Sequence, residues 1–177
     1  MPSGKQRAHM DIFDQKLEKE AAAQGITRVP AVWVEKAGVT KGFLCARTTD
    51  AWIYKAGVRL VTDLEREPRK DSLHHRSSGL DSTTAKLCAD HDILVAIDVA
   101  LLRTLDPNIL GRTMQNITLC RRYKAQMCVI SNATKADELL HAPDVHGLLV
   151  SLGMSQGEAT KALSALDTAY TAFSRKK

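Results

Sequence analysis

Short apolar runs alternate with longer amphipathic segments over the first 130 residues of the chain. The runs are rich in Val, Ile, Leu and Ala, as expected of buried strands. Such alternation is typical of βα units, in which consecutive strands pair in parallel and helices cover the sheet. It predicts about six parallel strands, at residues 29–34, 42–46, 59–64, 93–97 and 127–130, with a further strand near 10–12.

Helices are expected between these runs, at residues 13–24, 50–56, 82–89 and 107–124. The last segment carries the clearest signals, because Asp106 can cap its start and Pro107 suits the first helical turn. Its apolar stripe, which should face the core, consists of Leu110, Met114, Ile117 and Cys120.

After residue 131 the pattern contains helices only. Residues 143–154 form an amphipathic helix that Gly153 can end, and Ser155 and Glu158 have the spacing of a capping box at the start of a second helix. Their apolar stripes are Val145, Leu148, Leu149 and Leu152 in the first, and Ala159, Ala162, Leu163, Leu166, Tyr170 and Phe173 in the second. The whole pattern predicts one α/β domain over residues 1–177, with two C-terminal helices, a flexible tail at 1–9 and a basic tail at 174–177.

Composition narrows the class of protein. Hydrophobic residues make up 44% and charged residues 25% of the chain, which excludes a disordered or collagen-like protein. The longest stretch without Asp, Glu, Lys or Arg, residues 145–157, is too short to span a membrane, and the first ten residues lead into Asp11 and Asp14 and not into an apolar signal segment. We therefore expect a cytoplasmic protein without membrane contact, whose four cysteines are reduced and mostly buried.

Positive charge is concentrated in one part of the chain. Residues 99–136 carry six cations against the single acid Asp106, an excess that matches the formal net charge of +5. The cations are Arg103, Arg112, Arg121, Arg122, Lys124 and Lys135. Such a distribution favours nucleic-acid binding, and because aromatic residues make up only 5% of the chain, the contacts should be mainly to phosphate. A solvated helix face is the alternative.

The leading candidate site is the polar segment 65–82, which follows the end of a predicted parallel strand. Such segments are usually much shorter, and the carboxyl ends of parallel strands are where α/β proteins place their sites. Its cations alternate with acids that can orient them toward a phosphate or a partner carboxylate. Together with cations near other strand ends it predicts one edge that faces RNA or a partner, formed by Arg47, Arg66, Arg69, Lys70, Arg76, Arg103 and Lys135. A salt-bridged loop in solvent explains the segment nearly as well.

No enzyme constellation assembles in the sequence. It contains no G-x-S-x-G elbow, Walker A loop or dinucleotide-binding glycine pattern. The candidate metal ligands are His9, Asp11, Asp63, Asp98 and the pair His74-His75, and we do not regard them as a credible set. We therefore predict no catalytic residue and no stoichiometric transition metal in this chain.

Several motifs in the second half resemble one known family. The spacing is most specific over residues 131–164, with supporting matches at 69–71 and in AKLCADHDI and ILVAID. The motifs are Ser131-Asn132-Ala133, Pro143-Asp144, the apolar run 148–152, Gly153-Met154 and Lys161-Ala162. In order and spacing they resemble ribonuclease P protein component 3 of archaea and its eukaryotic counterpart, and the likeness extends over residues 54–164.

The resemblance implies a TIM-barrel-like α/β fold, here shortened or incomplete because a full barrel takes about 250 residues. It also implies a protein subunit of ribonuclease P, the endonuclease that removes the 5′ leader from precursor tRNA. In that family the RNA subunit cleaves, using Mg²⁺, so the chain alone is expected to be non-catalytic and to bind no cofactor. The implied partners are the ribonuclease P RNA, protein component 2, in a heterodimer or heterotetramer, and precursor tRNA.

Two other functions stay open from the sequence. A metal-dependent phosphoesterase of the PHP-like barrel class needs a His-x-His motif near the first strand, where this chain has His9-Met10-Asp11. A basic scaffold protein of another ribonucleoprotein is the third possibility.

Overall fold

All strands in the described part of the chain run parallel to their neighbours. The computed structural model describes residues 9–38, 41–66, 71 and 77–175. One sheet has the order β3-β4-β5-β6-β7 and the other pairs β1 with β2. The strands are β1 (His9–Asp11), β2 (Ile26–Arg28), β3 (Ala31–Trp33), β4 (Phe43–Ala46), β5 (Leu60–Val61), β6 (Leu94–Asp98) and β7 (Met127–Ile130).

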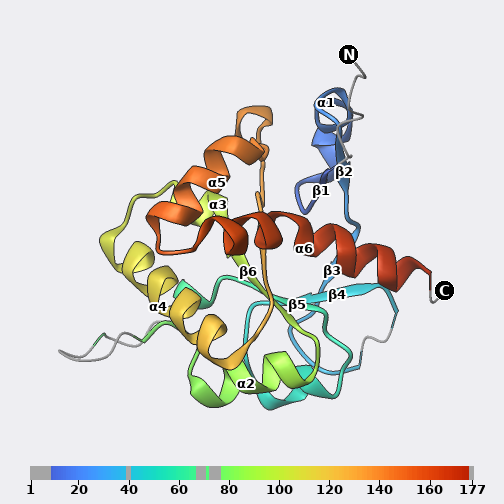
Figure 1. The fold of residues 1–177 in the computed structure, drawn as a ribbon. Coiled ribbons are helices and arrows are strands. Elements are labelled where there is room, and N and C mark those ends of the chain that lie inside the picture. Colours follow the sequence, from blue (N-terminus) through green and yellow to red (C-terminus); the bar gives the residue numbers. More distant parts are fainter. Residues whose placement is uncertain (1–8, 39–40, 67–70, 72–76, 176–177) are drawn as a thin grey trace.

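Helices connect and cover these strands (Figure 1). The α-helices are α1 (Glu18–Ala23), α2 (Ser82–Asp90), α3 (Val99–Leu102), α4 (Pro107–Tyr123), α5 (Ala142–Ser151) and α6 (Gln156–Ser174). Short 3₁₀ helices are η1 (Gln15–Leu17), η2 (Ala51–Tyr54), η3 (Leu64–Arg66) and η4 (Ala136–Glu138). Among the described residues, no helix is long and apolar enough to cross a membrane.

The alternation of side chains along β6 explains the layers. Leu94 and Ala96 belong to a buried cluster that contains Leu166 of α6, whereas Val95 packs in a second cluster with residues of α2 and α4. Helix α6 accordingly crosses one face of the sheet (Figure 1), and α2 and α4 cover the other. The strand buries all five of its residues, as expected when both faces of a parallel sheet are covered.

Backbone hydrogen bonds join the two sheets just beyond the carboxyl ends of β7 and β1. The Asn132 N–H donates to the Ile12 carbonyl and the Asp14 N–H donates to the Ala133 carbonyl, each at 2.9 Å. At the other side, only Val29 and Pro30 separate β2 from β3. The two sheets are therefore linked both by hydrogen bonds and by the chain.

The predicted α/β class, the parallel pairing and the two C-terminal helices are confirmed. The capping boxes and caps follow the sequence: Asp106 accepts from the Asn108 N–H at 2.8 Å, and Ser155 accepts from the Glu158 N–H at 3.2 Å. All four cysteines are free and buried. Residue 9, which we expected in the N-terminal tail, begins β1.

Other sequence predictions were wrong in detail. The prediction missed β2, whose Ile26-Thr27-Arg28 has a single buried apolar residue. The strand expected at 59–64 ends at Val61, because Asp63 has a positive φ of 59° that stops the extended backbone. The helix expected at 50–56 is the 3₁₀ helix η2, and the one expected at 13–24 begins as η1.

The buried face of α4 also differs from the predicted stripe. Met114 is 46% exposed, and the residues that α4 buries include the polar side chains Thr113 and Asn116. The helix is rotated relative to the prediction because one side of it packs against the two described ends of the 65–82 segment as well as against the sheet. These ends, residues 64–66 and 77–82, are called its first and second stem.

Candidate functional site

A hollow of about 550 Å³ lies where β4 and β5 end. It opens between the residues that follow β4 and the two stems of the 65–82 segment, at the edge of the sheet where α/β proteins place ligands. Its lining is Arg47, Thr48, Thr49, Asp50, Asp63, Leu64, Arg66, Ser77, Ser78, Gly79, Leu80, Asp81 and Thr84.

Arg47 is held in place on two sides. Its guanidinium carbon lies 4.5 Å from the centre of the Trp33 ring, and its Nε donates to Asp63 Oδ2 at 2.7 Å. A second arginine, Arg66, lies 3.9 Å from the other oxygen of the same carboxylate. Asp63 thus sits between two cations, and the left-handed backbone at this position turns its side chain away from the strand direction.

Helix α4 holds the first stem of the 65–82 segment. The Arg112 guanidinium donates to the Glu65 carbonyl at 2.9 Å and to Asp71 Oδ1 at 2.8 Å and 3.0 Å. Both side chains of this ion pair are largely buried. Arg112, which we counted among the basic surface residues, is therefore a structural residue.

A buried amide ties the two stems together. Asn116 Nδ2 donates to Glu65 Oε1 at 2.9 Å on the first stem and to the Ser78 carbonyl at 3.1 Å on the second. Gly79 lies so close to the first stem that a Cβ atom there would meet the Leu64 carbonyl oxygen at 2.2 Å. The sequence analysis missed Asn116. It could have been found as a polar residue one helical turn after Arg112, on the same face of α4.

Buried carboxyl groups collect at the carboxyl ends of β1, β5 and β6. Burial raises the pKa of Asp98 to about 6, assisted by its interaction with Asp63, while the Asn132 amide opposes the rise. Burial likewise raises the pKa of Asp11 to about 6 and that of Glu65 above its usual range. Asp11 and Asp98 are therefore protonated only below about pH 6, well above the range in which exposed aspartates take up protons.

The Ser131-Asn132-Ala133 motif holds two of these carboxyl groups. The Ser131 N–H donates to Asp11 Oδ1 at 2.8 Å, and Asn132 Nδ2 donates to Asp98 Oδ2 at 2.9 Å. Asp98 Oδ1 also accepts from the Leu101 N–H at 3.3 Å and so caps α3. The motif therefore anchors the strand ends to one another.

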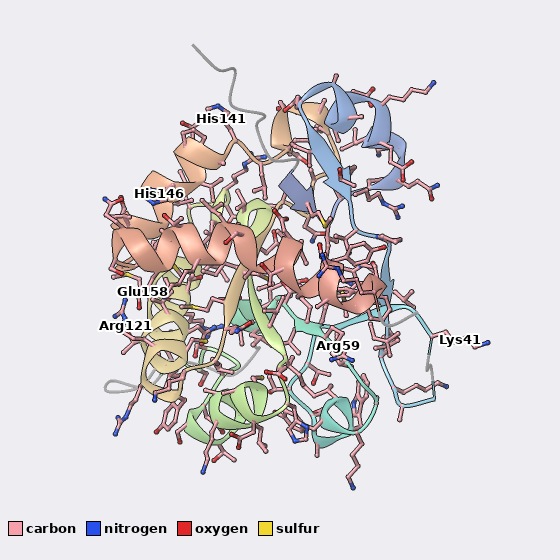
Figure 2. The ribbon with its side chains drawn as sticks, turned by 45° about the vertical axis from the view of Figure 1, so that its right-hand side comes forward. Lys41, Arg59, Arg121, His141, His146 and Glu158 are labelled. Carbon is pink, nitrogen blue, oxygen red and sulfur yellow. The ribbon has the colours of Figure 1, made fainter. Side chains whose placement is uncertain are left out.

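The basic surface is smaller than the sequence indicated. Arg121 donates to both oxygens of Glu158, at 2.6 Å and 2.8 Å, and to the Gly153 carbonyl at 2.7 Å (Figure 2). Hydrogen bonds from Arg121 lower the pKa of Glu158 to about 2. Arg112 and Arg121 are in ion pairs, and the exposed cations of the 99–136 window that are not in ion pairs with other described residues are Arg103, Arg122, Lys124 and Lys135.

The structure brings together only part of the predicted edge. Arg47 and Arg66 share the hollow. Arg103 directly follows α3 and Lys135 precedes η4, so both come after strand ends but do not line the hollow. Arg69, Lys70 and Arg76 lie outside the described residues, as do His74 and His75. In the described part of the chain, no three His, Cys, Asp or Glu side chains are grouped so as to hold a metal ion.

The fold and this strand-end site define a parallel α/β protein, and comparisons with known proteins narrow the class. No family model matches the chain. It is 27% identical over 127 residues to a Methanosarcina barkeri protein called ribonuclease P protein component 3, which covers 67% of this chain. The chain spans about half, 53%, of that relative's length.

A solved structure has a similar fold. One chain of a cryo-EM structure of archaeal ribonuclease P with mature tRNA superposes with a TM-score of 0.65 at 15% identity. The match covers 94% of this chain and 81% of that one. The arrangement of strands and helices described above therefore occurs in a protein of known structure.

Proposed function

We propose that this chain is a protein subunit of ribonuclease P, supporting the RNA-catalysed removal of the 5′ leader from precursor tRNA. The observation that carries the proposal is the agreement of two comparisons, a curated relative by sequence and a solved chain by fold, on the same enzyme. In this role the chain acts in an endoribonuclease without cleaving RNA itself.

The surface chemistry supports this role. Exposed Arg103, Arg122, Lys124 and Lys135 offer cations for phosphate contacts, and Arg47 and Arg66 add two more beside a polar hollow. Phosphate contacts position a protein on RNA without reading its sequence. The proposed partners are the ribonuclease P RNA, protein component 2 and, in the holoenzyme, precursor tRNA. Mg²⁺ serves the RNA, and the chain itself binds no cofactor.

We further propose that the seven strands represent an incomplete barrel related to the TIM barrel. All of them pair in parallel, and hydrogen bonds connect the ends of β7 and β1. In addition, β2 of one sheet is followed after two residues by β3 of the other sheet. Both features support a sheet that curls toward closure.

RNA that copurifies with the tagged full-length chain from its native cells tests the proposed function. Enrichment of ribonuclease P RNA over total RNA is expected. A mixture of RNAs without such enrichment would support a scaffold of another ribonucleoprotein. Absence of RNA together with one bound transition metal per chain would support the PHP-like phosphoesterase.

A further inference from the structure

We propose that the hollow at the ends of β4 and β5 binds one nucleotide unit of RNA, with its phosphate on Arg47 and Arg66 and its ribose on Asp50. The nucleotide is the ligand inferred for this hollow. That the nucleotide is part of an RNA rests on the proposed function.

Arg47 is held in a fixed position at the edge of the hollow. One face of its guanidinium is covered by Trp33 and its Nε is bonded to Asp63, yet the side chain is 55% exposed. In the part of the chain that the structure describes, its Nη nitrogens have no other partner. An arginine fixed in this way offers a planar pair of N–H donors to a phosphate and loses little side-chain entropy on binding.

The hollow is lined by both cations and carboxylates. Asp63 is shared by Arg47 and Arg66, and Asp81 accepts from the Thr84 N–H at the start of α2, so Asp50 is the carboxylate that the hollow presents to a ligand beside the two arginines. A ligand that satisfies both sides carries a negative group at one end and hydrogen-bond donors at the other. A nucleotide has this distribution, because its phosphate is anionic and its ribose hydroxyls and base N–H groups can donate.

Asp50 and its neighbour Thr48 offer polar groups to the ribose. Asp50 is exposed, and its carboxylate has no partner among the described residues. The neighbouring Thr48 hydroxyl accepts from the Asp50 N–H at 3.2 Å, which leaves its O–H available for a ligand. In dinucleotide-binding α/β folds, a carboxylate accepts from a ribose hydroxyl in this way.

Size is consistent with this ligand. The volume of about 550 Å³ falls within the roughly 300–1,000 Å³ typical of small-molecule sites. Trp33 does not line the hollow and Arg47 covers one face of its ring, so the proposed contacts involve the phosphate and the ribose and not a stacked base. This agrees with a chain that is poor in aromatic residues.

Titration of the ¹⁵N-labelled full chain with 5′-uridine monophosphate, uridine and inorganic phosphate tests the proposal. We expect the Trp33 indole and Arg47 Nε signals to shift with the monophosphate, and uridine and phosphate each to bind at least ten-fold more weakly. Equal affinity for phosphate and the monophosphate would reduce the hollow to an anion site. Unmoved Trp33 and Arg47 signals would overturn the proposal.

Two variants separate the proposed contacts. Arg47→Lys keeps the charge but loses the planar donor pair, and should weaken monophosphate binding at least five-fold. Asp50→Asn removes an acceptor charge, and should weaken monophosphate binding while strengthening phosphate binding. The matched control is Arg28→Lys, because Arg28 is also paired with a carboxylate, Glu18 at 3.0 Å, but lies outside the hollow.

An equal loss in the Arg28→Lys control would show that the effect is not specific to the hollow and would contradict the proposal. If ribonuclease P RNA still copurifies with a chain that binds no nucleotide, the hollow has been misassigned and the proposed function stands. Nucleotide binding by a chain that never copurifies with that RNA would refute the proposed function alone.

Discussion

At the scale of single residues, the buried acids at the strand ends are the least expected feature of a basic chain. Asp98 is 3% exposed and Asp11 is fully buried, and each accepts N–H bonds without a cation partner among the described residues. Because burial raises their pKa to about 6, the folded protein binds protons between pH 4 and pH 6 that the unfolded chain has already released. The stabilisation of the folded state by this proton binding is complete below about pH 4 and is lost as the pH rises through 6.

Asp98→Asn should test this directly. Asparagine resembles the neutral acid, since it keeps an acceptor for the α3 cap and can donate to Asp63. The variant should match the parent near pH 4 and exceed its free energy of unfolding at pH 7 by up to about 3 kcal/mol, the value of a two-unit pKa shift. Urea unfolding at several pH values measures it.

The exposed acid Asp137 supplies the control, and Asp137→Asn should leave the pH dependence unchanged. A parent protein whose stability rises between pH 4 and pH 6 would contradict the assignment of protonated carboxyl groups. So would an Asp98→Asn variant that is less stable than the parent at pH 7.

Gly79 offers a second residue-level prediction. It has a φ of +72°, and an added Cβ would meet the Leu64 carbonyl oxygen at 2.2 Å. Gly57 has nearly the same φ, +73°, with nothing within 4 Å of the added atom. We expect Gly57→Ala to cost about 1–2 kcal/mol for the backbone strain alone, and Gly79→Ala to cost clearly more. Equal losses in thermal unfolding would show that the two stems can separate without penalty.

At the scale of elements, helix α4 holds the two ends of the 65–82 segment together. Its Arg112 and Asn116 contact both stems, whereas its cap, length and end follow from local sequence. Asn116→Ala removes the donor to Glu65 and leaves that buried carboxyl group without its amide partner. The expected loss is about 1–3 kcal/mol in the free energy of unfolding.

Thr118→Ala on the exposed side of the same helix is the control for this variant. Thr118 donates only to the Met114 carbonyl within the helix, so its replacement should change stability by less than about 0.5 kcal/mol. Alanine has a higher helix propensity than Asn or Thr, so comparable losses for the two variants in chemical denaturation would contradict a specific role of Asn116 in holding the 65–82 segment.

The elements also show what sequence reasoning can and cannot reach. Strands such as β6 and helices such as α6 were predictable because burial on a regular period leaves a local signal. The three-residue β2 and the rotation of α4 were not, because both depend on contacts with distant residues. Arg47 and Arg66 were foreseen as neighbours from parallel topology, but the stack on Trp33 and the shared Asp63 required three-dimensional placement.

At the scale of the whole molecule, ion pairs determine which cations are available for the proposed RNA contacts. Arg122 and Lys124 are exposed, whereas Arg121 is bound to Glu158 (Figure 2). Replacing Arg122 or Lys124 with alanine should flatten the salt dependence of RNA binding by about 0.7–0.9 in slope per lost phosphate contact. Filter binding of ribonuclease P RNA at several salt concentrations measures this.

Combining Arg121→Gln with Glu158→Gln is the matched control, because it removes an ion pair without changing the net charge. Its slope should equal that of the parent chain. If the control flattens the slope as much as Lys124→Ala does, Arg121 contacts the RNA and the pairing with Glu158 does not survive binding.

Reconstituted cleavage of precursor tRNA, with each component omitted in turn, tests the central claim most directly. The chain alone should not cut, and adding it together with protein component 2 to the cognate RNA should increase the rate of 5′-leader removal and lower the Mg²⁺ that is required, because its cations offset RNA self-repulsion. Cleavage by the protein without RNA, or no stimulation when both proteins are present, would contradict the account.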